Sequence, residues 1–191
     1  TWLDELTVAL VPYFSVDENS LPEYEWYHDG VAYCLKNKIM NGDENKFFNP
    51  EKNIIWAEIL QILYNMEETK TATEEDSVWY ATAVKWAKDC RLIYENDSDF
   101  NPESAISRQQ LASVLYLYAQ FKGYDVSVGE ETNILSYDDA FDISEYAIPA
   151  MQYVIGAGIV NGKTPSTVNP KDNATRAEIA MILYRFIEKV K

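Results

Sequence analysis

The dipeptide Asn-Pro occurs three times in this chain, at Asn49-Pro50, Asn101-Pro102 and Asn169-Pro170, and similar residues surround each copy. About two dozen residues before each proline stands an aromatic residue, namely Trp26, Trp79 and Tyr146. An internal repeat constrains the fold more than any other sequence feature, because every copy must form the same supersecondary unit.

Each repeat has the pattern of a helix, a turn-rich loop and a second helix. The first helices are predicted at about 25–37, 78–90 and 144–157, and the second helices at about 55–66, 107–120 and 175–190. Apolar residues in the second helices recur at helical spacing, as in Ile179, Ile182, Leu183 and Phe186. A proline about five residues before each second helix fits an extended loop that turns into a helix.

The first and third loops share an Asn-Gly step, at Asn41-Gly42 and Asn161-Gly162. Asn-Gly accepts positive φ angles, so we expect a tight turn at this step. The second loop is one residue shorter and lacks both glycines, which predicts a different loop path.

A single helix pair of this size buries too little surface to be stable alone, so the repeats must pack on one another. The expected fold is therefore all-α, with three helix–loop–helix repeats packed with pseudo-threefold symmetry. The predicted organisation is an N-terminal helix at 1–13 followed by repeats at 14–67, 68–121 and 122–191. Polar, acidic linkers join the repeats, and the second linker is the longer one.

Composition excludes several classes of function. The chain has 16 basic and 31 acidic residues, a net charge of −15, which disfavours nucleic acid and anionic membrane surfaces as partners. No apolar run is long enough for membrane insertion. Cys34, Cys90 and the lone His28 form no metal or catalytic motif, so we expect neither cofactor nor metal. The two cysteines are expected to be small buried residues, although a bridge between them stays open.

The start of the second helix is the most informative part of the repeat. Ser107 with Gln110, and Thr175 with Glu178, have the spacing of a capping box, which is a structural role. The residue after each hydroxyl is Arg108 or Arg176.

A cation in the first turn of a helix opposes the helix dipole and costs a few tenths to about 1 kcal/mol unless something offsets it. Two explanations are open: the arginine and the free helix amides converge on an anion such as a carboxylate, or the arginine pairs with an acidic residue of a neighbouring repeat.

The first repeat departs from this pattern at Ile55-Trp56-Ala57-Glu58, where Trp56 replaces the arginine and no hydroxyl is present. This position cannot bind an anion in the same way. Trp56 either packs in the interior, which is the more frequent role of tryptophan, or stacks on a sugar ring.

In the third repeat, Gly158-Ile159-Val160-Asn161-Gly162 leads into Val168-Asn169-Pro170 and then Thr175-Arg176-Ala177-Glu178, with Tyr137-Asp138-Asp139 upstream. This combination resembles the S-layer homology domain. The second repeat matches less closely, and the first matches mainly through its similarity to the others; together they cover about 14–191.

The resemblance implies three repeats with grooves between them, which anchor surface proteins and enzymes non-covalently to secondary cell-wall polymers. Those polymers often carry a pyruvate ketal, whose carboxylate agrees with the anion site inferred at Arg108 and Arg176. The family's arginine maps onto these two residues, and its loop glycine maps onto Gly162 and Gly42. The departures in the first two repeats suggest that one or two grooves function.

Further candidates for groove walls are aromatic residues of the first helices and polar residues of the loops: Trp26, Tyr27, Trp79, Tyr80, Trp86, Asn41, Asn161 and Lys163. With the capping residues Glu178 and Gln110, they complete the predicted ligand-binding set. The alternative for the tryptophans is core packing, and for the asparagines turn formation.

We therefore expect an extracellular monomer at the bacterial cell wall that binds a secondary polymer attached to peptidoglycan. Two other classes compete with this reading. The repeats could have lost glycan binding and serve as a structural or protein-interaction module. Catalysis by acidic pairs such as Asp138 and Asp139 is disfavoured, because no nucleophile or apolar pocket accompanies them. Short acidic runs lack the spacing of a calcium loop.

Overall fold

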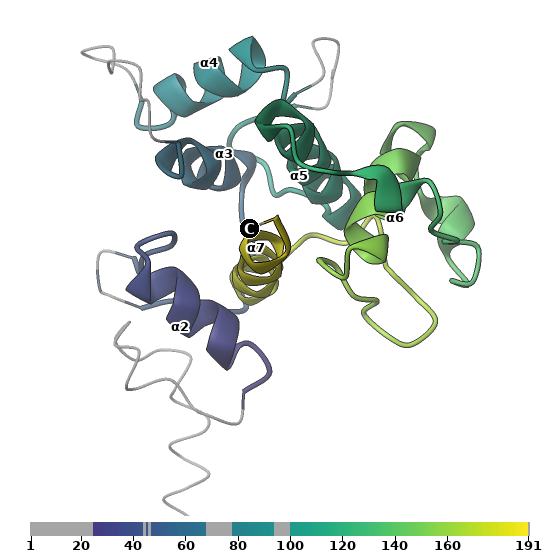
Figure 1. Cartoon of the computed structure of the whole chain (residues 1–191). Helices are drawn as coiled ribbons and strands as arrows, with labels where there is room; N and C mark the ends of the chain where they lie inside the picture. The colour runs from purple at the N-terminus through teal and green to yellow at the C-terminus, as the bar shows by residue number, and fades with distance from the viewer. Residues whose placement is uncertain (1–24, 44, 46, 68–77, 94–99, 191) are drawn as a thin grey trace, which may run out of the picture. The chain divides into compact units, whose positions relative to one another are not determined.

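A computed structural model describes residues 25–43, 45, 47–67, 78–93 and 100–190 (Figure 1). The described residues form two compact units, the first within 25–53 and 175–188 and the second within 54–174 and 189–190. The helix predicted at 1–13 lies outside the described residues.

The described residues form six α-helices and no β-strand, which confirms the all-α class. The helices are α2 (His28–Lys36), α3 (Trp56–Asn65), α4 (Ala81–Asp89), α5 (Arg108–Lys122), α6 (Ile148–Gly156) and α7 (Arg176–Val190). The second helices α3, α5 and α7 begin one residue after the predicted positions. The first helices α2, α4 and α6 begin about three residues later than predicted, and a 3₁₀ turn at Glu145–Ala147 precedes α6.

In the first unit, α2 of the first repeat packs on α7 of the third repeat. The helices approach closely at Gly30, where an added Cβ would lie 2.8 Å from the Cα of Met181. One turn further along, the rings of Tyr33 and Tyr184 lie 5.0 Å apart. The buried Cys34 thiol donates to the Ala180 carbonyl at 3.6 Å, and burial raises its pKa to about 12. Both Cys34 and the half-buried Cys90 are free thiols.

Gly30→Ala should destabilise the protein by about 2 kcal/mol, because the added methyl group meets backbone that can move aside only if the two helices separate. Thermal or denaturant unfolding measures this change. The control is Asp29→Ala, at the neighbouring exposed position of α2. If Gly30→Ala unfolds with the wild-type midpoint, the close approach of α2 and α7 is wrong.

In the second unit, α4 lies against α3, and α6 lies against α5 (Figure 1). Each pair joins the first helix of one repeat to the second helix of the preceding repeat. Between α3, α4 and α5 the ring of Trp86 contacts those of Tyr64, Tyr118 and Phe121, with centroids 5.6 to 6.4 Å away. Helix packing between repeats, which the sequence required, is thus observed within each unit.

A closed ring of three backbone hydrogen bonds lies inside the second unit. Ile54 N donates to Ala174 O at 3.0 Å, Ile106 N donates to Ile54 O at 3.1 Å, and Ala174 N donates to Ile106 O at 3.0 Å. Each residue is fully buried and stands two positions before the first residue of its second helix. Equivalent residues of the three repeats therefore bond to one another cyclically, in a local threefold pattern.

The longer second linker folds against α6. A 3₁₀ turn at Ser127–Gly129 contacts this helix, and a Cβ on Gly129 would lie 3.1 Å from Tyr153 N. None of the helices that the structure describes has the length and apolar character required to cross a bilayer.

Candidate functional site at the junctions between repeats

The loops turn at a different place from the one predicted. Gly42 and Gly162 have no left-handed conformation, so the expectation of positive φ at the Asn-Gly step is wrong. Left-handed residues occur at the end of each first helix instead, at Lys38 with φ 56°, Arg91 with φ 57° and Gly158 with φ 67°. Two more, Asn49 at φ 54° and Asn169 at φ 49°, stand in the loops at Asn-Pro steps. The chain reverses where the helix ends, and the second repeat shares this turn although it lacks the glycines.

Gly162 is required for close approach and not for its φ angle. A Cβ at this position would contact Thr164 O and would lie 2.8 Å from Thr167 O. These two carbonyls fold the loop back beside the glycine, where Lys163 N and Thr164 N both donate to Thr167 O. Any side chain at residue 162 would displace this turn.

Capping boxes hold the starts of α5 and α7, as predicted. Gln110 Oε1 accepts from Ser107 N at 2.9 Å, and Glu178 Oε2 accepts from Thr175 N at 2.9 Å. The hydroxyls accept in return from Gln110 N at 3.4 Å and Glu178 N at 3.3 Å. Gln110 and Glu178 therefore have a structural role at these helix starts.

Arg176 reaches from α7 into the loop of the first repeat. Its Nε donates to Phe48 O at 2.8 Å and its Nη2 to Asn41 O at 2.6 Å, while the guanidinium lies 4.9 Å from the centre of the Phe48 ring. The Arg176 backbone amide donates to Lys52 O at 2.9 Å. The side chain is 9% exposed.

Arg108 makes equivalent contacts at the junction between the second and third repeats. From α5 its Nε donates to Val168 O at 2.8 Å and its Nη2 to Asn161 O at 3.0 Å, in the loop of the third repeat. Its backbone amide donates to Asp172 O at 2.9 Å, and the residue is 5% exposed. Loop carbonyls thus offset the position of each cation at the positive end of a helix.

The third junction has Trp56 in place of the arginine. Trp56 is 3% exposed, and its ring meets that of Phe100 edge-on at 5.2 Å, so the expectation of interior packing is confirmed. Its backbone amide still donates to Ser104 O at 3.1 Å. Among the described residues, the Trp56 indole N–H is the buried side-chain donor without a hydrogen-bond partner. The backbone geometry of this junction is therefore kept without the cation.

The loops of the first and third repeats have opposite charges at two equivalent positions, in exchanged order. In the third repeat Lys163 Nζ lies 3.6 Å from Asp172 Oδ2, and both side chains are about half exposed. At the equivalent positions the first repeat has Asp43 and Lys52.

The Asp43 carboxylate accepts from Phe47 N and Asn45 N, each at 2.9 Å, and from Asn49 Nδ2 at 2.8 Å. The hydrogen bond from Phe47 is the main reason that the pKa of Asp43 lies below its ordinary value of 3.8, and Lys52 lowers it further.

The loop around Asp43 should open at acid pH. The pKa of Asp43 is lower in the folded protein than its ordinary value of 3.8. The ionised carboxylate therefore stabilises the fold fully above pH 3.8, and this stabilisation is lost as the pH falls through the pKa of the folded state. The amide resonance of Phe47, followed by NMR from about pH 6 to about pH 2, should shift with this titration. Asp43→Asn should abolish the titration and Asp29→Asn should leave it. An unchanged titration in Asp43→Asn would contradict the assignment.

A polar cluster connects the start of α5 to the start of the first helix of the third repeat. Gln109 Nε2 donates to Ser144 Oγ at 3.1 Å and to Tyr146 OH at 3.2 Å, and Gln109 Oε1 accepts from Ser144 N at 3.0 Å. Lys171 Nζ also donates to Ser144 Oγ. An exposed aromatic ring, bonded to Gln109, and an exposed ammonium group, bonded to Ser144, are thereby linked through one network.

The aromatic residue before each first helix is exposed in all three repeats. Trp26 is 57% exposed, Trp79 59% and Tyr146 44%. Core packing is therefore wrong for Trp26 and Trp79, although both touch the next aromatic residue edge-on, Tyr27 and Tyr80 respectively. Trp86, in contrast, does pack among other rings. A face of each exposed ring remains available to a flat, partly apolar ligand such as a sugar.

A family model, the S-layer homology domain, matches three segments of this sequence, at residues 22–58, 70–112 and 136–180. These segments cover more than half of the chain. The chain belongs to the S-layer homology domain family. The three segments also show that the repeats inferred from Asn-Pro are S-layer homology repeats; the bounds given to each repeat above remain a prediction.

Several known proteins are similar to this S-layer homology chain. It is 29% identical over 185 residues to an exoglucanase, XynX, of Acetivibrio thermocellus, covering 92% of this chain and 16% of that protein. It is 26% identical over 199 residues to the surface-layer 125 kDa protein of Lysinibacillus sphaericus, covering 95% and 16%. A cellulosome-anchoring protein of Acetivibrio thermocellus is 31% identical over 91 residues, covering 48% and 20%.

The chain thus spans a fifth or less of the length of these relatives. An enzyme among them matches over its S-layer homology part alone, so the match does not suggest catalysis here. The family, together with the surface-layer and anchoring proteins among the relatives, indicates attachment at the cell surface.

Sequence reasoning missed several residues that build the S-layer homology junctions. Asp139 accepts from Val168 N at 3.0 Å and from Asn169 N at 2.6 Å, and so holds the loop that Arg108 also holds. Gln109 and Lys171 were not among the predicted site residues. Both residues belong to a network between repeats, which the sequence does not show. The one available signal was the position of Gln109 next to Arg108.

Proposed function

We propose that this module anchors a longer surface protein to the bacterial cell wall by binding an acidic secondary cell-wall polysaccharide at the junctions between repeats. The family and its anchoring relatives support the attachment. The acidic polymer, including one that carries a pyruvate ketal, is inferred from the side chains at the junction of α5 with the loop of the third repeat.

The observation that carries the proposal is the placement of Tyr146 and Lys171 around Ser144. The exposed Tyr146 ring offers a face on which a sugar ring can stack, and the Lys171 ammonium offers a charge for a carboxylate. Lys163, exposed on the same loop, adds a second cation. Cations are scarce in a chain of net charge −15, so their gathering on one loop favours an acidic ligand.

The three junctions differ in how well they suit such a ligand. At the position of Lys171 the first repeat has Glu51 and the second has Glu103, whose carboxylate accepts from Tyr80 OH at 3.0 Å. A carboxylate there repels an acidic polymer. We infer that the junction at α5 is the principal acidic site, and that Trp26 and Trp79 contribute little to binding, because a glutamate replaces the lysine at their junctions.

The two arginines act on the polymer through the loops in this proposal. Arg108 and Arg176 hold the carbonyls of Asn161 and Asn41, so they shape loops whose outer residues meet the ligand. Direct contact of either arginine with an anion stays a prediction. The module itself is proposed to act as a monomer.

Co-sedimentation with purified cell walls tests the proposed function. The protein should pellet with intact walls and stay in solution with walls from which the secondary polymer has been removed by mild acid. Removal of the polymer leaves the peptidoglycan, which serves as the matched control. If the protein pellets equally with both preparations, the polymer is not the ligand. If it pellets with neither, anchoring to that wall is wrong and the protein-interaction alternative replaces it.

A further inference from the structure

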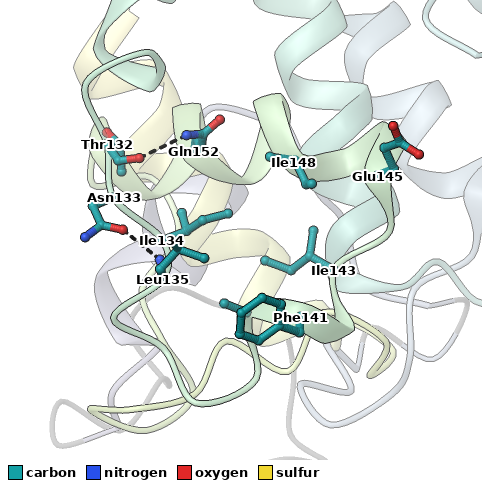
Figure 2. Close-up of a pocket in the computed structure, with 10 residues that line it drawn as sticks. Thr132, Asn133, Ile134, Leu135, Phe141, Ile143, Glu145, Ile148 and Gln152 are labelled. Carbon is teal, nitrogen blue, oxygen red and sulfur yellow. Dashed lines mark hydrogen bonds between the residues drawn. The ribbon is translucent and has the colours of Figure 1, made fainter.

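An apolar hollow of about 490 Å³ lies between the long second linker and α6, on the second unit (Figure 2). Its walls are mostly aliphatic and aromatic side chains, among them Ile134, Leu135, Phe141, Ile143 and Ile148. Residues of this longer linker form part of the wall of the hollow, so neither of the other two repeats has the same set of lining residues.

Hydrogen bonds fix the walls of the hollow. Gln152 of α6 donates from Nε2 to Thr132 O at 3.0 Å, and Thr132 Oγ1 donates to Val128 O at 2.7 Å. Leu135 N donates to the side chain of Asn133 at 2.9 Å. Close approach at Gly156, where a Cβ would meet Thr132 Oγ1, leaves the linker no room to shift toward α6. The hollow is thus preformed.

Large apolar side chains at this hollow face solvent. Phe141 is 91% exposed, Leu135 67% and Ile148 37%. Figure 2 shows Phe141 and Leu135 at the rim and Ile148 on α6 above them. A single exposed apolar residue is ordinary, but a group of them around a concave surface is typical of an interaction site.

The segments that form the hollow carry negative charge only, although Lys171 from another segment bonds Ser144 between two of the lining residues. No lysine, arginine or histidine occurs between residues 123 and 162. Glu145 lines the hollow, and four further exposed carboxylates stand on the segments that form it: Glu130, Glu131, Asp138 and Asp142. Together these carboxylates favour a cationic partner at the hollow.

We propose that this hollow docks a cationic amphipathic segment of a partner protein. An apolar side chain of that segment fills the space between Phe141, Leu135 and Ile148, and its lysine or arginine side chains lie against the carboxylates at the rim. The hollow borders the proposed cell-wall site, since its lining residues Ile143 and Glu145 flank Ser144, but none of its lining residues belongs to that site. It therefore gives the anchored module a second, protein-directed contact.

Fluorescence anisotropy with synthetic helical peptides tests the proposal. The probe is a labelled peptide with leucines on one face and lysines on the other. It should bind the full chain, whereas a peptide with glutamate in place of lysine, or serine in place of leucine, should not. Phe141→Ala should weaken binding of the Lys/Leu peptide at least about tenfold, because it removes a central apolar contact. Glu145→Gln should weaken it less.

The control is Phe121→Ala, which removes an exposed aromatic residue at the end of α5, away from the hollow. Equal loss in Phe121→Ala and Phe141→Ala, or equal binding of the Lys/Ser peptide, would overturn the proposal in favour of general charge attraction. Concentration-dependent dimers that disappear in Phe141→Ala would assign the hollow to a second copy of the chain. Phe141→Ala should leave binding to cell walls unchanged. A failure of the docking proposal can therefore be distinguished from a failure of the anchoring function.

Discussion

Arg108→Ala is expected to destabilise the protein by about 3 kcal/mol. The residue is 5% exposed and its guanidinium donates to the carbonyls of Val168 and Asn161, so its loss leaves buried acceptors unpaired. A hydrogen bond that involves a charged group contributes about 1.5–3 kcal/mol, and an unpaired buried carbonyl costs about 1–3 kcal/mol. Denaturant unfolding, analysed over the whole transition, measures the change.

Arg108→Lys should restore little of this stability, because an ammonium group cannot reproduce the two-pronged geometry of the guanidinium. Lys85→Ala is the matched control, since it removes an exposed cation that pairs with Asp89 in the same helix. Arg176→Ala should resemble Arg108→Ala, because it makes the corresponding bonds in the first unit. Wild-type stability in both arginine variants would show that the loops do not depend on them.

Tyr146→Ala combined with Lys171→Glu is expected to weaken binding to cell walls at least about 30-fold. The first change removes the stacking face and the second replaces a favourable charge with a repulsive one, and the loss of a central aromatic contact alone is often worth about 2 kcal/mol. The amount of protein bound at increasing concentrations of cell walls gives the affinity.

Two controls separate binding from folding in that experiment. Tyr146→Phe loses the hydroxyl that accepts from Gln109 but keeps the ring, so it should bind nearly as wild type does. Trp79→Ala removes the equivalent exposed ring where Glu103 excludes an acidic ligand, and it should also change binding little. If Trp79→Ala costs as much as the double change, the assignment of the principal site is wrong.

Local sequence patterns were sufficient to predict the helices and the starts of the second helices. Apolar spacing placed the starts of α3, α5 and α7 to within a residue, and the capping pairs Ser107/Gln110 and Thr175/Glu178 form as expected. These features depend on residues three or four positions apart, which a single sequence displays directly. The repeat itself then implied that the copies pack on one another.

Local sequence patterns could not predict which groups the two arginine side chains contact. Arg108 meets the Val168 carbonyl, 60 residues further along the chain, and Arg176 meets that of Phe48, 128 residues back. The sequence indicated that each cation opposes the helix dipole at the helix start and requires a compensating negative partner. An anion or an acidic side chain of a neighbouring repeat was therefore predicted. Backbone carbonyls carry no signature in a sequence, because every residue has one.

The exposure of Trp26 and Trp79 was missed for a related reason. Tryptophan is usually buried, and nothing in the sequence around these residues reveals that they precede their helices and point outward. The left-handed turn at Lys38 and Arg91 was hidden in the same way, since neither residue is typical of that conformation.

Calorimetric titration of purified secondary polymer into the full chain tests the central claim most directly, when the same polymer with its carboxyl groups reduced to alcohols is titrated in parallel. The account predicts saturable binding of the acidic polymer, with an affinity at least about tenfold higher than that of the reduced polymer and a difference that shrinks at high salt. Equal affinity for the two polymers would contradict the acidic site at Tyr146 and Lys171.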